Sequence, residues 1–172
     1  MAAKIILDAV ALLKADHRKV EGLFAQFEAA KGDGRKRSLA EQICMELTVH
    51  TKIEEDIFYP ACEGKVEEDL LKEAYVEHDG AKVLIAEIEG GNPGDEFYDA
   101  KVKVLSEMIE HHVEEEEQRV EGMFSQARKA GLDMDALGEQ MADRKAQLIA
   151  QYKAEGLPTP ETPTFEATHL GQ

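Results

Sequence analysis

The stretch His50-Thr51-Lys52-Ile53-Glu54-Glu55-Asp56-Ile57-Phe58-Tyr59-Pro60 decides the fold, because it sets a histidine and a glutamate into an apolar helical stripe. Leu47, His50, Glu54 and Ile57 follow one another at steps of three and four residues. In a helix these steps place all four side chains on one face. A buried carboxylate is costly unless it is paired or binds a metal. The stretch therefore predicts a helix whose inward face carries metal-ligating side chains.

The second half of the chain repeats this arrangement. His17 and His50 are separated by nearly the same length of sequence as His78 and His112. The matching motifs are Asp16-His17 with Glu77-His78, and His50-x-x-x-Glu54 with His112-x-x-x-Glu116. The two halves thus look like copies of one helical hairpin.

Four segments carry apolar residues at helical spacing, and three glycine-containing breaks separate them. The apolar stripes run Val10–Phe27, Ile43–Ile57, Leu71–Ile88 and Leu105–Phe124, and the breaks are Gly32–Gly34, Pro60–Gly64 and Gly90–Gly94. Short breaks between long helices favour antiparallel neighbours. We therefore predict an all-α fold, an antiparallel up-down-up-down four-helix bundle over residues 1–130. Met1–Leu13 is expected to begin its first helix and Gly131 to end its fourth.

Two further segments follow the bundle. Residues 131–156 predict an accessory C-terminal helix from Met134 to about Tyr152, with a weaker apolar stripe that packs outside the bundle. Residues 157–172 are rich in proline and threonine and are expected to form a flexible tail.

Composition narrows the possible partners. The chain has 172 residues, enough for one domain with a single core, and a formal net charge of -16. Such a charge repels nucleic acid and anionic lipid, so we expect neither as a partner. No stretch approaches the roughly 18 apolar residues of a membrane span. Two cysteines, Cys44 and Cys62, form no disulfide framework and suit the cytoplasm. We expect a monomer or weak homo-oligomer.

The folding distances bring the four histidines to one level. The position midway between His17 and His50 falls in the first glycine break, and the position midway between His78 and His112 falls at the end of the third. When a chain folds back at its midpoint, two equidistant residues become level. All four histidines should then form one layer, roughly 20–25 Å from the bundle ends at about 1.5 Å per residue.

The residue types in that layer select the metal. Four imidazoles and the carboxylates of Glu54 and Glu116 exceed what one tetrahedral zinc needs and are too rich in nitrogen for calcium or magnesium. Such a set in a bundle core favours two iron ions bridged by the glutamates, although zinc or manganese could replace iron in vitro. His111 and Glu115 have the same spacing as His112 and Glu116, but their stripe becomes polar. We therefore place His111 at the rim of the site, and His169 in the exposed tail.

With these residues in place, the chain resembles the hemerythrin-like HHE cation-binding domain family over about residues 5 to 130. The matching segments are Leu12–His17, His50–Pro60, Glu77-His78-Asp79 and His111–Glu116. The resemblance implies a hemerythrin-like bundle and a centre of two non-haem iron ions, bridged by oxide or hydroxide. It also implies that the metal ligands are His17, His50, Glu54, His78, His112 and Glu116.

One position departs from the family pattern. Oxygen-carrying hemerythrins have a further histidine one turn before the helix-three histidine, where this chain has Ala74 and Tyr75. Tyr75 could reach the cluster, and so could Tyr59 if the helix distorts before Pro60. The alternative for both tyrosines is core packing with a hydrogen-bonded hydroxyl. No catalytic residue beyond the metal site is predicted.

The leading functional hypothesis is a di-iron site that binds O₂, peroxide or nitric oxide and turns peroxide over as a catalase or peroxidase does. Open metal positions are what such chemistry requires. The alternative is a protein that binds or stores oxygen or iron, or senses them, without turnover. A third hypothesis, a metal-free bundle that acts through partners, would require the alignment of the histidines to be accidental.

Overall fold

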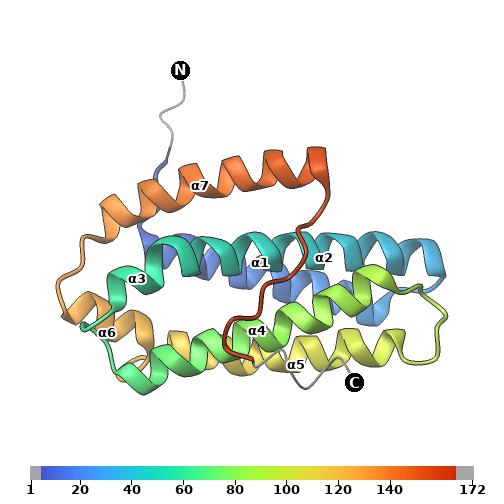
Figure 1. Cartoon of the computed structure of the whole chain (residues 1–172), viewed down its shortest axis with the longest axis horizontal. Coiled ribbons are helices and arrows are strands. Elements are labelled where there is room, and N and C mark those ends of the chain that lie inside the picture. Colours follow the sequence, from blue (N-terminus) through green and yellow to red (C-terminus); the bar gives the residue numbers. More distant parts are fainter. Residues whose placement is uncertain (1–4, 166–172) are drawn as a thin grey trace.

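A computed structural model describes residues 5–165, and within that range all regular structure is helical (Figure 1). Four long helices form the bundle: α1 (Ala9–Ala29), α2 (Asp33–Ile53), α4 (Glu68–Gly90) and α5 (Tyr98–Glu117). Consecutive helices are joined by short turns and run antiparallel, side by side along the long axis of the molecule (Figure 1). This confirms the predicted all-α four-helix bundle. No helix in the described part of the chain is long and apolar enough to cross a membrane.

The first helix begins later than Met1–Leu13 suggested. Its N-cap is Asp8, whose side chain accepts a hydrogen bond from the Ala11 amide at 2.8 Å. An aspartate in this position satisfies an amide that the helix itself leaves unpaired. Residues 5–8 are therefore not helical, and residues 1–4 lie outside the described range.

The second helical segment ends at Cys62, inside the break predicted for Pro60–Gly64, but it is not one uniform α-helix. It passes into a π-helical turn, η1 (Glu54–Phe58), and a short helix, α3 (Tyr59–Cys62), before the chain turns at Glu63. In a π-turn the amide of one residue bonds to the carbonyl five residues earlier. The Tyr59 amide accordingly bonds to the Glu54 carbonyl. The wider turn brings the Tyr59 side chain to the same side of the helix as Glu54.

The fourth helix is shorter than predicted. It ends at Glu117, and a separate helix, α6 (Met123–Lys129), follows after a tight turn. A Cβ atom at Gly122 would lie 2.5 Å from the Gln118 carbonyl oxygen, so only glycine fits this turn. The prediction of one helix reaching Gly131 was wrong, and so was the inward placement of Val120, which is 66% exposed.

The C-terminal segments lie over the bundle. Helix α7 (Met134–Glu155) runs along α1 and α2 (Figure 1). The chain then crosses the bundle toward α4, where the amide and hydroxyl of Thr164 both donate to Asp79 Oδ2, at 2.8 Å and 2.6 Å. Part of the segment expected as a flexible tail is thus docked on the bundle. Residues 166–172, with His169, lie outside the described range.

Two apolar clusters fill the bundle, one toward each end. The first includes Leu13, Ile53, Phe58, Leu71 and Phe124. The second includes Phe24, Ile43, Leu47, Ile85 and Leu105. His17 of α1 and His78 of α4 fall between residues of the two clusters, and together with polar side chains of α2, η1 and α5 they form a single layer across the bundle.

Candidate metal centre

The polar layer contains all six side chains that the sequence nominates. Each is buried, with at most 6% of its surface exposed: His17, His50, Glu54, His78, His112 and Glu116. Helices α1, α4 and α5 supply one histidine each, α2 supplies His50, and the glutamates come from η1 and α5. Their ligand atoms form two groups that share Glu54, each small enough for one ion.

The first group joins His17, His50, Glu54 and Glu116. His17 Nε2 faces Glu116 Oε2 at 3.3 Å, and His50 Nε2 faces Glu54 Oε1 at 3.3 Å. These four atoms are fully buried, and none of them makes a hydrogen bond. Unsatisfied buried polar atoms are costly and rare, so each requires an explanation. Four that converge on one point fit a cation.

The second group uses the other oxygen of each glutamate. Glu54 Oε2 lies 3.1 Å from His78 Nε2, and Glu116 Oε1 lies 3.2 Å from His112 Nε2. The two Nε2 atoms are 3.2 Å apart. Adjacent ligands of an octahedral ion with bonds of about 2.1 Å are separated by roughly 3 Å. The observed separations fit a second cation, and each glutamate then has one oxygen at either position.

Tyr59 reaches this second group through the π-turn. Its hydroxyl oxygen lies 2.7 Å from Glu116 Oε1, 3.1 Å from Glu54 Oε2 and 3.1 Å from His78 Nε2. Burial and the carboxylates of Glu116 and Glu54 raise the pKa of Tyr59, so in the metal-free chain its hydroxyl is protonated and donates to Glu116. Tyr75 does not join either group, and its ring packs edge-on against Tyr59 with centroids 5.1 Å apart.

The charges inside the layer shift the pKa values of its side chains. Burial lowers the pKa of His50, but the carboxylates of Glu54 and Asp16 outweigh it and raise the value to about 10. Burial and the Glu116 carboxylate raise the pKa of Glu54, but His50 and His78 outweigh them and bring it to about 2. A metal that binds here would therefore displace the proton of His50.

Each histidine is also held from behind by a carboxylate of the neighbouring helix. His50 Nδ1 bonds to Asp16 at 3.2 Å, and His78 Nδ1 bonds to Glu55 at 3.0 Å. His112 Nδ1 bonds to Glu77 at 3.0 Å. His17 Nδ1 faces Glu117 at the longer distance of 3.5 Å. We call these four acids the outer carboxylates. An acceptor at Nδ1 keeps the proton there and turns the Nε2 lone pair toward the metal position.

The outer carboxylates run around the bundle in a closed circle, and each stands next to a ligand in the sequence. Asp16 and Glu77 precede His17 and His78, and Glu55 and Glu117 follow Glu54 and Glu116. Sequence reasoning missed their role, although Asp16 and Glu77 belong to the repeated motifs and Glu55 and Glu117 directly follow them. The repetition of an acid beside each ligand was the signal that could have identified them.

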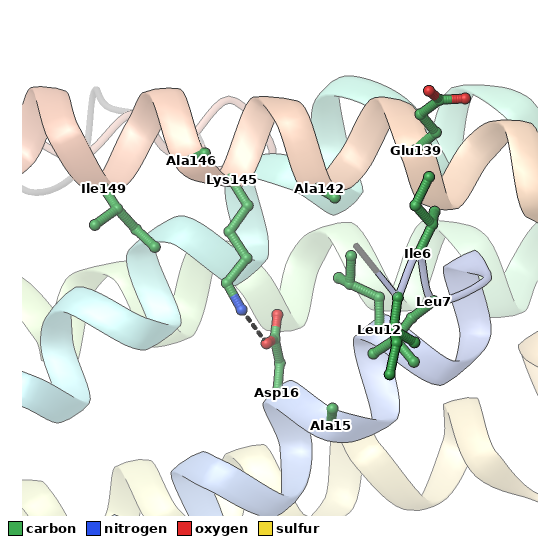
Figure 2. Close-up of a pocket in the computed structure, with 11 residues that line it drawn as sticks. Ile6, Leu7, Leu12, Ala15, Asp16, Glu139, Ala142, Lys145, Ala146 and Ile149 are labelled. Atoms are coloured by element: carbon green, nitrogen blue, oxygen red, sulfur yellow. Dashed lines mark hydrogen bonds and ion pairs between the residues drawn. The ribbon is translucent and has the colours of Figure 1, made fainter. Parts of the chain in front are cut away.

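Three outer carboxylates are in turn paired with a basic side chain. Lys145 of α7 bonds to Asp16 (Figure 2), and Arg18 bonds to Glu117. Lys82 lies 2.9 Å from Glu55 and also bonds to Asp79, the residue that holds Thr164. The accessory helix and the docked tail therefore both connect to the metal layer. Asp16 and Lys145 also line a cavity of about 340 Å³ between α1 and α7 (Figure 2).

These features together define a helical-bundle metal-binding protein, with imidazoles and glutamates gathered in a buried layer. The comparisons with known proteins name the family. The family model for the hemerythrin HHE cation-binding domain matches residues 8–124, and the chain belongs to this family.

Two individual proteins are similar to the chain. The crystal structure of a hemerythrin HHE cation-binding domain-containing protein from Mycobacterium kansasii superposes with a TM-score of 0.72 at 22% identity, covering 87% of this chain and 94% of the other. A protein of Nostoc sp. named DNA nickase is 27% identical over 106 residues, which are 62% of this chain and 30% of that protein. The chain thus matches less than a third of the length of this relative.

Proposed function

We propose that the layer binds two non-haem iron ions, bridged by Glu54 and Glu116 and by oxide or hydroxide. The observation that carries this proposal is the convergence of four unsatisfied buried ligand atoms, each belonging to an imidazole or to a glutamate that also faces the second position. Mixed imidazole and carboxylate ligands in a bundle core favour iron over zinc or calcium. Membership of a cation-binding family supports a metal of some kind.

The space beside the layer limits the ligand to a very small molecule. A cavity of about 10 Å³ is bordered by all four histidines, by Asp16, Glu46 and Thr51, and by Val20, Leu47, Ile109 and Val113. This is about the volume that one water molecule needs. O₂, hydrogen peroxide and nitric oxide exceed water by only one heavy atom and are the ligands we propose, whereas organic substrates are far too large.

We further propose that the site turns peroxide over, as a catalase or peroxidase does. The iron pair, when bound, supplies the redox steps and the open positions. The chain itself excludes bulk water with its two apolar clusters. The outer carboxylates fix the imidazoles, and the Tyr59 hydroxyl holds a proton 2.7 Å from Glu116 Oε1.

Metal analysis and a peroxide assay test the proposal in sequence. Purified protein should contain two iron ions per chain, and it should release oxygen from peroxide faster than the same amount of free iron. A His50→Ala variant should lose iron and rate together. Two irons with no rate above that of free iron would remove the enzymatic part. The alternative is then a binding, storage or sensing protein, and reversible loss of an oxygen-dependent absorption band under vacuum would identify oxygen carriage.

Whether the chain binds nucleic acid stays a separate question, because the name of the Nostoc relative refers to DNA. The matched region is a minor part of that relative, and the net charge of -16 opposes contact with a phosphate backbone. We propose that this chain has no nucleic-acid partner and acts in the cytoplasm as a monomer or weak homo-oligomer. A gel-shift experiment with nicked and intact duplexes should detect no complex.

A further inference from the structure

A third group of ligand-type side chains lies outside the buried layer, where α4 faces α5. It consists of Glu77, His111 and Glu115. His111 Nε2 lies 3.3 Å from Glu115 Oε1 and 3.7 Å from Glu77 Oε2. His111 is 65% exposed, whereas the two glutamates are partly buried. The other oxygen of Glu77 accepts the bond from His112 Nδ1 at 3.0 Å, so this group adjoins the metal layer.

Glu77 differs from the other outer carboxylates in what surrounds it. Asp16, Glu55 and Glu117 are each paired with a lysine or arginine. Among the described residues, no lysine or arginine lies within ion-pair distance of Glu77 or Glu115. The place of the basic side chain is taken by the second carboxylate and by an imidazole. Two adjacent carboxylates repel each other unless a proton or a cation lies between them.

We propose that Glu77, His111 and Glu115 bind one divalent first-row transition-metal ion in an outer site. The bound ion supplies the positive charge that Lys145, Lys82 and Arg18 supply to the other outer carboxylates. One imidazole and two carboxylates suit Mn²⁺, Fe²⁺ or Zn²⁺ and leave the remaining positions to water. Because His111 is exposed, this ion exchanges with solvent, unlike an ion in the buried layer.

The outer site is connected to the buried layer through one side chain. Glu77 would face the outer ion with Oε2 while Oε1 holds His112. An ion that draws charge from Glu77 weakens the hold of Glu77 on the His112 Nδ1 proton. Occupation of the outer site therefore changes the second metal position. This connection rests on the proposed function, whereas the outer site itself does not.

Manganese binding measured by electron paramagnetic resonance tests the outer site on the iron-loaded full chain. Bound Mn²⁺ loses the six-line signal of the free ion, so the fraction bound is read directly. We expect one Mn²⁺ per chain in addition to the iron, with affinity lowered at least tenfold by His111→Ala and by Glu115→Gln. Glu114→Gln is the matched control, because it removes the same charge from the exposed residue that precedes Glu115 in the sequence. This variant should leave the affinity for Mn²⁺ unchanged.

The outcomes separate the outer site from general attraction of cations to an acidic surface. Equal loss of binding in Glu114→Gln and Glu115→Gln would mean diffuse attraction and would overturn the proposal. Absence of Mn²⁺ binding at submillimolar concentration would also overturn it. Iron content is measured on the same samples before the titration, so failure of the buried centre is recorded independently of the outer site.

Discussion

Replacing Tyr59 by phenylalanine should weaken one of the two metal positions and spare the other. The hydroxyl lies among the ligand atoms of the second position, 3.1 Å from His78 Nε2 and 3.3 Å from His112 Nε2. It has no hydrogen bond to His17 or His50, whose Nε2 atoms belong to the first position. The variant should therefore bind its first ion as the unchanged protein does and its second more weakly.

The size of the effect follows from the contacts that are lost. Loss of an outer-shell partner typically lowers metal affinity ten- to hundredfold, and loss of an oxygen ligand should cost at least as much, about 1.4–2.8 kcal/mol. In the metal-free chain the change leaves Glu116 Oε1 without the donor at 2.7 Å. An unsatisfied buried acceptor costs about 1–3 kcal/mol, so the metal-free variant should also be less stable to urea.

Stepwise titration of metal-free protein, with bound metal measured after dialysis, provides the assay. Tyr75→Phe is the control, because Tyr75 contacts the Tyr59 ring and belongs to neither ligand group. Two ions bound with unchanged affinity in Tyr59→Phe would refute a contribution of the hydroxyl to the second position and leave Tyr59 as a packing residue. Equal weakening of both ions would show that the whole layer had been disturbed.

Three further changes test the surrounding structure. Removal of bound metal by a chelator should lower the melting temperature measured by calorimetry. A metal concentration of a hundred times Kd stabilises the folded chain by about 2.7 kcal/mol, or roughly 5–10 °C for a chain of this size. An unchanged melting temperature would mean that the metal adds nothing to stability. Gly138→Ala should cost about 1–3 kcal/mol in urea unfolding, because its Cβ would lie 2.3 Å from the Leu7 carbonyl oxygen, whereas Gly22→Ala, which meets nothing within 4 Å, should stabilise by up to about 1 kcal/mol. Asp8→Ala should remove about 1 kcal/mol at neutral pH. Burial raises the pKa of Asp8, but the Ala11 amide and Arg128 outweigh it and hold that pKa below 3.8. The stabilisation is thus complete above pH 3.8 and is lost as the pH falls through the lower folded value, so a difference between variant and parent that persists in strong acid would contradict this assignment.

The bundle and the composition of its polar layer could be predicted because both depend on spacing. Apolar residues at steps of three and four define the helices, and equal folding distances make the four histidines level. The comparisons confirm the family and the fold. That the six nominated side chains bind iron stays a prediction, although the structure brings all of them together.

The missed features depend on local backbone geometry that periodicity does not record. A stripe drawn through Glu116 to Val120 assumes an unbroken helix, yet the chain turns at Gln118, and Gly122 permits a turn too tight for any other residue. The π-turn at Glu54–Phe58 was likewise missed, because the stripe drawn through Glu54 and Ile57 assumes α-helical steps, whereas the residues buried after the π-turn are Phe58 and Tyr59. The sequence therefore predicted that Tyr59 reaches the cluster only if the helix distorts before Pro60.

The π-turn also makes the two halves of the repeat unequal. A symmetric pair of hairpins would give both candidate metal positions the same surroundings, and the four histidines and two glutamates keep that symmetry. Tyr59 breaks it, because after Glu117 the second hairpin leaves the helix and presents no equivalent side chain. Two ions bound in this layer would therefore differ in their surroundings, because only the second would have the Tyr59 hydroxyl beside it.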